Sequence, residues 1–374
     1  MGEVARVFLK LGTIAFGGPA VHIAMMQDEV VARRRWMDDQ EFLDLVGATN
    51  LIPGPNSTEM AIHVGFRRAR WRGLVTAGTC FIMPAALIVL ALAVVYVRYG
   101  STPQGEAVLY GIAPVVIAVV FQALMRLGRT AVKDVWLGVV GVAALALYLL
   151  GVNELVVLFG GALVMILVRN APRLGSSHHV WVPWAVPGMS LIAQVEPQRA
   201  FDLGRLFLVF LKVGALLYGS GYVLLAFLRS DLVHDLGWLT ERQLLDAIAI
   251  GQMTPGPVFT AATFIGYVLG GFTGAAIATI GIFLPSFVFV AALNPLVPRV
   301  RRSVWASAAL DGVNVAALGL MAGVTYQLGL RAVVDLPTAI LAVAAAIALF
   351  RFRVNSPWLV LAGAAVGGVV VWLR

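Results

Sequence analysis

Apolar residues run along this chain in long stretches that short polar loops separate. Six or more stretches approach the roughly 20 apolar residues that a membrane-spanning helix needs. Examples are residues 73–97, 134–151 and 356–373. This pattern predicts an all-α polytopic membrane protein, with the lipid bilayer as its surroundings.

Two of the apolar segments are interrupted by the same motif. Residues 50–56 read Asn-Leu-Ile-Pro-Gly-Pro-Asn, and residues 252–258 read Gln-Met-Thr-Pro-Gly-Pro-Val. Proline inside a helix removes a hydrogen bond and clashes with the preceding turn, so each segment is predicted to be two half-helices that meet at a break. Irregular backbone is tolerated in a bilayer only where protein or a water-filled cavity covers it. A matched pair of interrupted segments therefore points to the binding site of a transporter.

The two breaks belong to an internal repeat. Sliding the chain by 202 residues aligns Phe8-Leu9-Lys10 with Phe210-Leu211-Lys212, and after a one-residue slip Gly65 pairs with Gly266. The same offset of 202 aligns Trp36 with Trp238, Asp44 with Asp246, and the two Pro-Gly-Pro motifs. We therefore expect a first transporter repeat at residues 1–170, a connector at 171–199, and a second, inverted repeat at 200–374.

The charges of the loops predict the inversion. The loop at residues 67–72 carries four arginines, whereas its counterpart at residues 270–273 is uncharged. Since basic loops stay cytoplasmic, equivalent loops are expected on opposite sides of the membrane. The first broken segment has basic flanks on both sides, and its arms are too short to span at ~1.5 Å per residue. We expect about five spanning helices and one re-entrant helical hairpin per half; the alternative makes residues 180–195 an additional crossing.

Composition agrees with this picture. Of the 374 residues, 60% are hydrophobic and 12% charged, and the mean hydropathy is +0.91, far from the balance of a soluble domain. The net charge of +8 comes from arginines in short loops, so it indicates orientation and no nucleic-acid partner. The single cysteine, Cys80, excludes an intramolecular disulfide.

The breaks supply chemistry for binding an anion. A half-helix that begins at mid-membrane directs free N–H groups and its positive dipole end at the break, which suits an oxyanion. The alternative is that Pro-Gly-Pro only turns a hairpin. The glycine turns could add backbone donors, or the glycines could serve only the close packing of helices. Two repeat-related lysines could add positive charge, or their side chains could only extend to the membrane–water interface. The predicted substrate-binding residues are Lys10, Gly17, Gly18, Asn50, Pro53, Gly54, Pro55, Asn56, Ser57, Thr58, Lys212, Gly219, Ser220, Gly221, Gln252, Thr254, Pro255, Gly256 and Pro257.

One acidic residue stands beside the first break. Glu59 lies one turn into the post-break helix, and Ala261 occupies its place in the second half. Glu59 is the candidate proton-coupling residue, or an ion-pair partner for a basic residue. His22 and His63 lie in apolar surroundings and are expected to be packing or hydrogen-bonding residues and not metal ligands. Without a ligand-spaced His/Cys cluster, we expect no metal and no cofactor.

The motifs resemble the chromate ion transporter family in its long, two-domain form. In the first half the similar pieces are Phe16-Gly17-Gly18-Pro19, Trp36, residues 50–55 and Gly65-Phe66. In the second half they are residues 218–222, Trp238, residues 252–257 and Gly266-Tyr267. The resemblance covers nearly the whole chain except the connector. It implies an inner-membrane transporter that exports chromate, a dianion similar to sulfate in shape and charge, and confers chromate resistance.

Other function classes are less favoured. A permease for the uptake of sulfate or another oxyanion is the closest alternative. An intramembrane enzyme is disfavoured because the serine-hydrolase pattern around Gly219-Ser220-Gly221 fails at Tyr218, and a phosphate-binding loop for an ATP-driven pump is absent. We expect no enzymatic activity. The sequence is compatible with proton or counter-anion coupling and with a homodimer, and decides neither.

Overall fold

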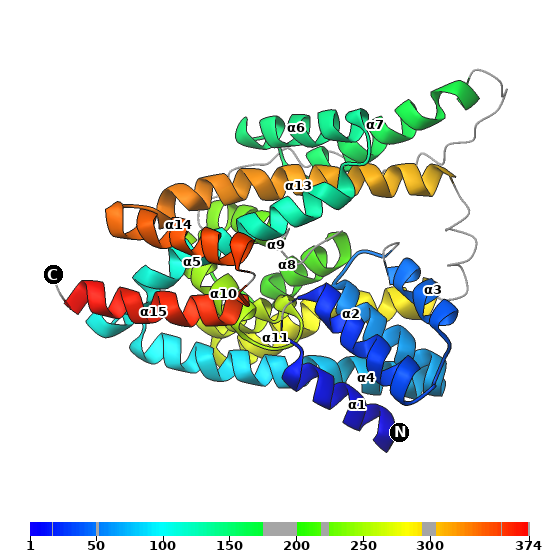
Figure 1. Ribbon diagram of the computed structural model, residues 1–374, viewed down its shortest axis with the longest axis horizontal. Coiled ribbons are helices and arrows are strands. Elements are labelled where there is room, and N and C mark those ends of the chain that lie inside the picture. The colour runs from blue at the N-terminus through cyan, green and yellow to red at the C-terminus, as the bar shows by residue number, and fades with distance from the viewer. Residues whose placement is uncertain are drawn as a thin grey trace.

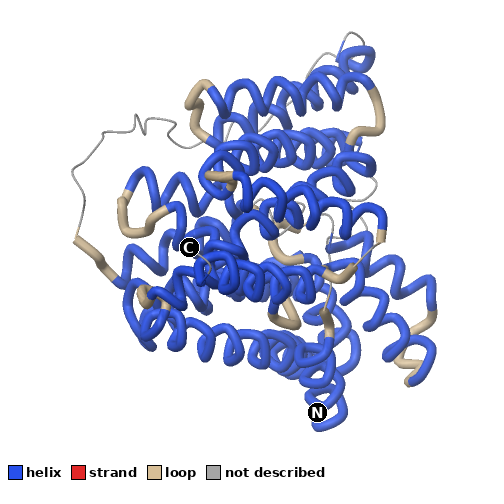
Figure 2. Tube along the Cα trace, turned by 60° about the vertical axis from the view of Figure 1, so that its left-hand side comes forward, coloured by secondary structure: helices blue, strands red, loops and turns tan. Residues whose placement is uncertain are grey.

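The computed structural model describes residues 1–16, 18–49, 52–174, 200–217, 224–293, 304–352 and 354–372, and every regular element in these ranges is a helix (Figures 1 and 2). Helix α7 includes the first residues of the predicted connector; the rest of the connector, residues 175–199 with the apolar run at 180–195, lies outside the described residues. The helices of the first half are α1 (Gly2–Ile14), α2 (Pro19–Gln27), η1 (Asp28–Arg33), α3 (Asp39–Thr49), α4 (Asn56–Tyr99), α5 (Pro103–Ala131), α6 (Val135–Leu149) and α7 (Glu154–Leu174). Those of the second half are α8 (Leu203–Leu216), α9 (Leu224–Leu228), η2 (Arg229–Asp235), α10 (Glu241–Met253), η3 (Val258–Thr260), α11 (Ala261–Leu293), α13 (Val304–Ala332), α14 (Leu336–Arg351) and α15 (Ser356–Trp372).

Several of these helices suit a membrane. Four are long and apolar enough to cross it, at Asn56–Tyr99, Pro103–Ala131, Val258–Ala292 and Trp305–Ala332. Shorter apolar helices lie at Val135–Leu149, Leu336–Arg351 and Ser356–Val370. The prediction of an all-α polytopic membrane protein is therefore confirmed.

The chain opens with an antiparallel pair of short helices. Glu3, near the start of α1, forms an ion pair with Arg34 just after η1, at 3.0 Å. Further along α1, Lys10 forms an ion pair with Glu29. Residues later in α1 therefore face residues earlier in the segment formed by α2 and η1, so the two segments are antiparallel. The chain returns to the side from which α1 started. At ~1.5 Å per residue α1 reaches only about 20 Å, less than the ~30 Å hydrocarbon core.

The first broken segment is a re-entrant hairpin. Nε of Arg67, near the end of the second arm, donates to Glu41 at the start of α3 over 2.6 Å. A continuous broken helix would hold these two residues tens of ångströms apart, so the arms α3 and 56–68 lie antiparallel. In the second half, a side chain at Gly251 of α10 would approach the carbonyl oxygen of Val258 to 3.2 Å across the break.

A second reversal follows each hairpin inside α4 and α11. Arg70 and Gly271 are repeat equivalents, and both adopt left-handed backbone, with φ of 51° and 61°. Residues eight apart across the turn touch, because a side chain at Gly65 would lie 2.3 Å from the carbonyl oxygen of Gly73. Gly266 and Gly274 repeat this contact at the same 2.3 Å. The small residues allow the two arms to pack backbone to backbone.

The repeats run in opposite directions. Tyr110, early in α5, donates a hydrogen bond to Asp335 just beyond the end of α13, at 2.6 Å. Further along α5, Cγ2 of Ile117 lies 3.7 Å from where a side chain at Gly329 of α13 would begin. Residues later in α5 therefore face residues earlier in α13, so these two helices are antiparallel. They are also repeat equivalents. The two halves are therefore homologous and inverted, as predicted.

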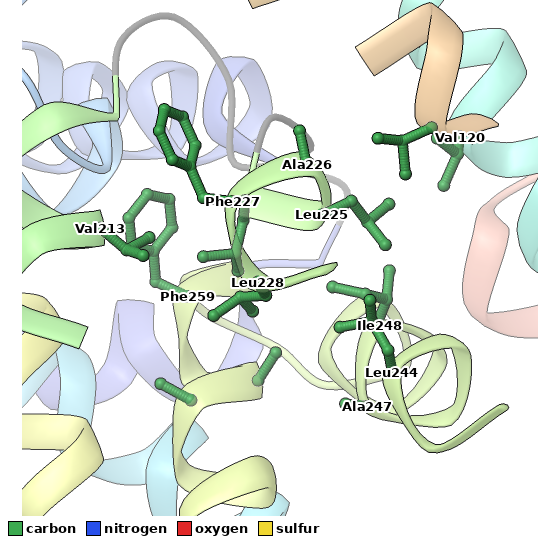
Figure 3. Packing of buried hydrophobic residues seen from close by; sticks show 14 of the residues in the cluster. Val120, Val213, Leu225, Ala226, Phe227, Leu228, Leu244, Ala247, Ile248 and Phe259 are labelled. Carbon is green, nitrogen blue, oxygen red and sulfur yellow. The ribbon is translucent and has the colours of Figure 1, made fainter. Parts of the chain in front are cut away.

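Helices of each half pack on helices of the other half. Helix α5 packs on α14 and α15, while α13 packs on α6 and α7 (Figure 1). Glycines bring both pairs together: Gly111 meets the backbone of Gly363, and Gly312 that of Gly161. The largest buried cluster centres on the second half, where Leu225 and Leu228 of α9 pack toward Val213, Leu244 and Phe259 (Figure 3).

Candidate functional site

The two helix breaks are tied to each other's halves by one repeated hydrogen bond. The backbone N–H of Gly54 donates to the carbonyl oxygen of Leu217, at 2.7 Å. The N–H of Gly256 donates to the carbonyl oxygen of Ala15, at 2.9 Å. Ala15 and Leu217 are the C-terminal caps of α1 and α8, whose last carbonyl groups have no partner within their helix. Each break therefore completes the first helix of the opposite half, which buries both breaks at the interface between the halves.

Neither break glycine can be replaced by a residue with a side chain without strain. Gly54 and Gly256 have φ of +138° and +87°, which L side chains rarely adopt. A side chain at Gly54 would strike Glu59 Oε1 at 2.3 Å and Ser286 Oγ at 2.7 Å. One at Gly256 would strike Cβ of Ala85 at 2.8 Å. Ala85 and Ser286 are themselves repeat equivalents, so each break lies against the long helix of the other half.

Glu59 occupies the first half's break. Its side chain is fully buried, and Oε1 accepts a hydrogen bond from Ser286 Oγ over 3.4 Å. Its Oε2 has no hydrogen-bond partner among the residues that the structure describes. The carboxyl group thus lies beside the N-terminal end of its own half-helix, where an incoming anion would be attracted. In the second half Ala261 is the counterpart, and no carboxyl group stands at that position.

Further polar groups without partners cluster on the same half-helix. Within the described ranges, Thr58 Oγ1 and both ring nitrogens of His63 are buried and unbonded. Glu59 and His63 are four residues apart and share one helix face. In the second half, Thr260 donates to the carbonyl of Pro257 at 2.8 Å, and Thr263 pairs with Thr279 at 2.7 Å. Buried polar groups nearly always have a partner, so this cluster on the first half-helix is unusual among the described residues.

His22 belongs to the opposite break. Its Nε2 lies 3.0 Å from the carbonyl oxygen of Ala15, the same oxygen that accepts from Gly256. Its ring meets Phe81 edge to face, with centroids 5.7 Å apart. His22 therefore supports the end of α1 where the second break attaches, which agrees with the packing role expected for it.

The two repeat-related lysines are already paired. Lys10 binds Glu29, and Lys212 binds Asp231 at 2.5 Å. Glu29 also accepts from Arg34 at 3.3 Å. Sequence reasoning missed both carboxylates, although they align with each other under the offset of 202 that relates the lysines. A dianion that uses these lysines has to compete with carboxylates of the protein.

The remaining predicted residues divide into two groups. Ser57 and Thr58 are buried on the first half-helix, which begins at Asn56, and Gln252 and Thr254 are buried before the second break. Thr254 caps α10 and donates to the carbonyl of Gly251 at 3.2 Å. Pro53, Pro55, Pro255 and Pro257 flank the two glycines, and Gly18 precedes α2 with φ of 84°. Gly17, Asn50, Gly219, Ser220 and Gly221 lie outside the described residues.

Comparisons with known proteins agree with this geometry. The family described as chromate transporter matches residues 2–166 and 204–369, one match in each half. A probable chromate transport protein of Synechococcus elongatus is 30% identical, covering 100% of this chain and 96% of the relative. Chromate transport proteins of Cupriavidus metallidurans and Pseudomonas aeruginosa are 31% and 33% identical, over 99% and 86% of this chain and 93% and 79% of those relatives. No solved structure matches the chain.

Proposed function

The chain belongs to the chromate transporter family, and we propose that it is a secondary transporter that exports chromate across the inner membrane and so confers chromate resistance. The observation that supports this most is the cluster at the first break. There a half-helix N-terminus, the buried Glu59 and the unbonded polar groups of Thr58 and His63 gather at the interface of two inverted halves. Transporters of inverted repeats bind their substrates at such breaks.

The chemistry of the break fits a tetrahedral dianion. An unpaired charge in a low-dielectric interior is heavily penalised, so the anion needs donors and positive potential. The two half-helix N-termini supply potential, and hydroxyl or amide groups supply donors. The candidate donors are Asn50, Asn56, Ser57, Thr58, Ser220, Gln252 and Thr254. We place the anion between the two Pro-Gly-Pro breaks, near the pseudo-two-fold axis.

Glu59 gives this site a means of coupling. An ionised carboxylate at the half-helix end repels a dianion, whereas a proton on Glu59 removes that repulsion and leaves a hydrogen-bond donor. Binding of the anion is thereby linked to the protonation of Glu59. If one proton accompanies one dianion, net negative charge leaves the cell, and an inside-negative potential favours this by ~2.3 kcal/mol per charge per 100 mV.

Transport into inverted membrane vesicles tests the proposal. Labelled chromate should accumulate in vesicles that carry the protein, and the rate should respond to an imposed potential and to a pH gradient. Labelled sulfate provides the second arm. Transport of sulfate without transport of chromate would contradict the proposed substrate, and transport only in right-side-out vesicles would contradict export.

A further inference from the structure

A charged cavity lies in the first half, away from the breaks. It measures about 500 Å³ and opens between the α1, α2 and η1 helices on one side and the end of α5 on the other. Five charged residues line it, and its other lining residues are apolar. The charged residues are Lys10, Asp28, Glu29, Arg33 and Arg126. We call it the α1–α5 cavity.

Only one of the cavity's basic side chains has no counter-ion. Lys10 is paired with Glu29, and Nε of Arg33 lies 2.8 Å from Asp28. Arg126 forms no hydrogen bond and no ion pair with any residue in the described ranges. A guanidinium group is always charged and presents a planar fork of donors that matches tetrahedral oxyanions. The cavity therefore holds one cation that is available to a ligand.

In the second half, the side chain at the position equivalent to Arg126 is hydrogen-bonded. Gln327 is the repeat counterpart of Arg126, since α5 and α13 align residue by residue at an offset of 201. Its Oε1 accepts a hydrogen bond from Arg229 of η2, and Arg229 donates to Tyr148 at 3.1 Å. Arg229 also pairs with Glu241 at 2.6 Å. These bonds join η2 to α13, and α9 packs on α13 beside them.

The first half lacks this bridge. The counterpart of Arg229 is Gln27, which donates to Asp39 at 2.9 Å, the counterpart of Glu241. The bond between the α2–η1 region and the α3 region is thus kept, while the bond to α5 is replaced by the cavity. In an inverted repeat, equivalent places face opposite sides of the membrane. The basic residues Arg129 and Lys133 near Arg126 put the α1–α5 cavity on the cytoplasmic side.

We propose that the α1–α5 cavity is a loading site for a tetrahedral oxyanion, and that Arg126 is its anion-binding residue. This inference rests on the proposed function, since the oxyanion is the one that the transporter exports. About 500 Å³ holds such an anion together with several waters at ~30 Å³ each. An anion that binds here remains partly hydrated. The same chemistry would also bind the phosphate of an anionic lipid headgroup.

Binding of labelled chromate to the purified full-length protein in detergent separates these outcomes. Arg126→Gln installs the residue of the second half, and we expect the dissociation constant for chromate to rise about tenfold to a hundredfold, as for a lost charged hydrogen bond. Arg129→Gln is the matched control, because it removes the same charge from the same helix outside the cavity and should bind as wild type does. Added phosphatidylglycerol should not compete with chromate in the wild-type protein.

Each result points one way. If the wild-type protein binds no chromate, the proposed function fails first. If the wild-type protein binds and Arg126→Gln binds equally well, the proposed function stands and the loading site is wrong. Loss of co-purifying phosphatidylglycerol in Arg126→Gln, with unchanged chromate binding, would assign Arg126 to a lipid headgroup and overturn the inference. A uniform loss in Arg126→Gln and Arg129→Gln would reduce the effect to general electrostatics and overturn it too.

Discussion

The two halves of this protein share one framework and differ in the chemistry placed on it. Both copies have the lysine–carboxylate pair, Lys10 with Glu29 and Lys212 with Asp231. Both copies have a break glycine that donates to the end of the opposite half's first helix. Glu59 and His63, in contrast, have Ala261 and Ile265 as their counterparts.

The difference teaches which residues the fold needs and which the transport cycle needs. A contact present in both halves holds an arrangement that both halves adopt, so it is expected to support structure. A polar group present in one half only cannot be required by the shared fold. Glu59, His63 and Arg126 are therefore the better candidates for acting on the substrate or a proton, and the lysines are weaker candidates than their repeat suggests.

The break glycines should give the largest effects, and different ones. Gly256→Ala meets the fixed Cβ of Ala85 and a strained backbone, so it should destabilise the protein by about 2–4 kcal/mol. Gly54→Ala shares the backbone strain but meets the movable carboxylate of Glu59, so it should cost less stability and lose most transport. Thermal unfolding and vesicle transport measure the two effects. Gly128→Ala, whose added side chain meets nothing within 4 Å, is the control. If both variants lose stability and transport to the same extent, the two breaks do not differ as proposed.

Glu59→Gln should change the pH dependence of transport. The amide keeps the shape and cannot release a proton, so anion binding should persist. One titrating group can change the transport rate up to about tenfold per pH unit, whereas the rate of the variant should stay constant within about twofold over the same pH range. The reciprocal change Ala261→Glu asks whether a carboxyl group at the second break can substitute. A wild-type pH profile in Glu59→Gln would make Glu59 a structural residue.

The lysines should differ from each other in stability. Lys212→Gln leaves Asp231 buried without its partner, at a cost of about 1–3 kcal/mol. Lys10→Gln should cost less, since Lys10 is about half exposed and Glu29 keeps Arg34. The charge-neutral pair Lys212→Gln/Asp231→Asn separates fold from substrate: recovery of both stability and transport means that Lys212 serves the fold. Recovery of stability alone would restore the predicted role of the lysines in binding the dianion.

Much of this comparison could be predicted from the sequence, because it depends on patterns that repeat. The offset that aligns the Pro-Gly-Pro motifs predicts two halves, and proline chemistry predicts the breaks. The hydrogen bond from Gly54 to Leu217 could not be predicted, because it joins residues far apart through the packing of two halves. The availability of Arg126 could not be predicted either, since it depends on which neighbouring carboxylates already have partners.

The smallest expected effect lies at the start of α6, at the residue that precedes the apolar helix Val135–Leu149. Asp134 caps α6, and the backbone N–H of Leu137, followed by the guanidinium of Arg169, lowers the pKa of Asp134 below its ordinary 3.8. Its contribution to stability is therefore complete above that value and is lost as the pH falls through the lowered pKa. Asp134→Asn keeps a good cap but removes the charge, so the variant should lose this acid dependence with little change in melting temperature at pH 7. Unchanged acid sensitivity in Asp134→Asn would assign the effect to another group.

The inversion of the two halves is most directly tested by labelling its two equivalent turns. Arg70→Cys and Gly271→Cys, each in a Cys80→Ala background, place single thiols at the two left-handed turns of α4 and α11. A side chain at Gly271 meets nothing within 4 Å, and Arg70 shows that the turn accepts one. In intact cells an impermeant thiol reagent should label Gly271→Cys and spare Arg70→Cys, and in inverted vesicles the pattern should reverse. Labelling of both thiols from the same side would contradict the inverted repeat.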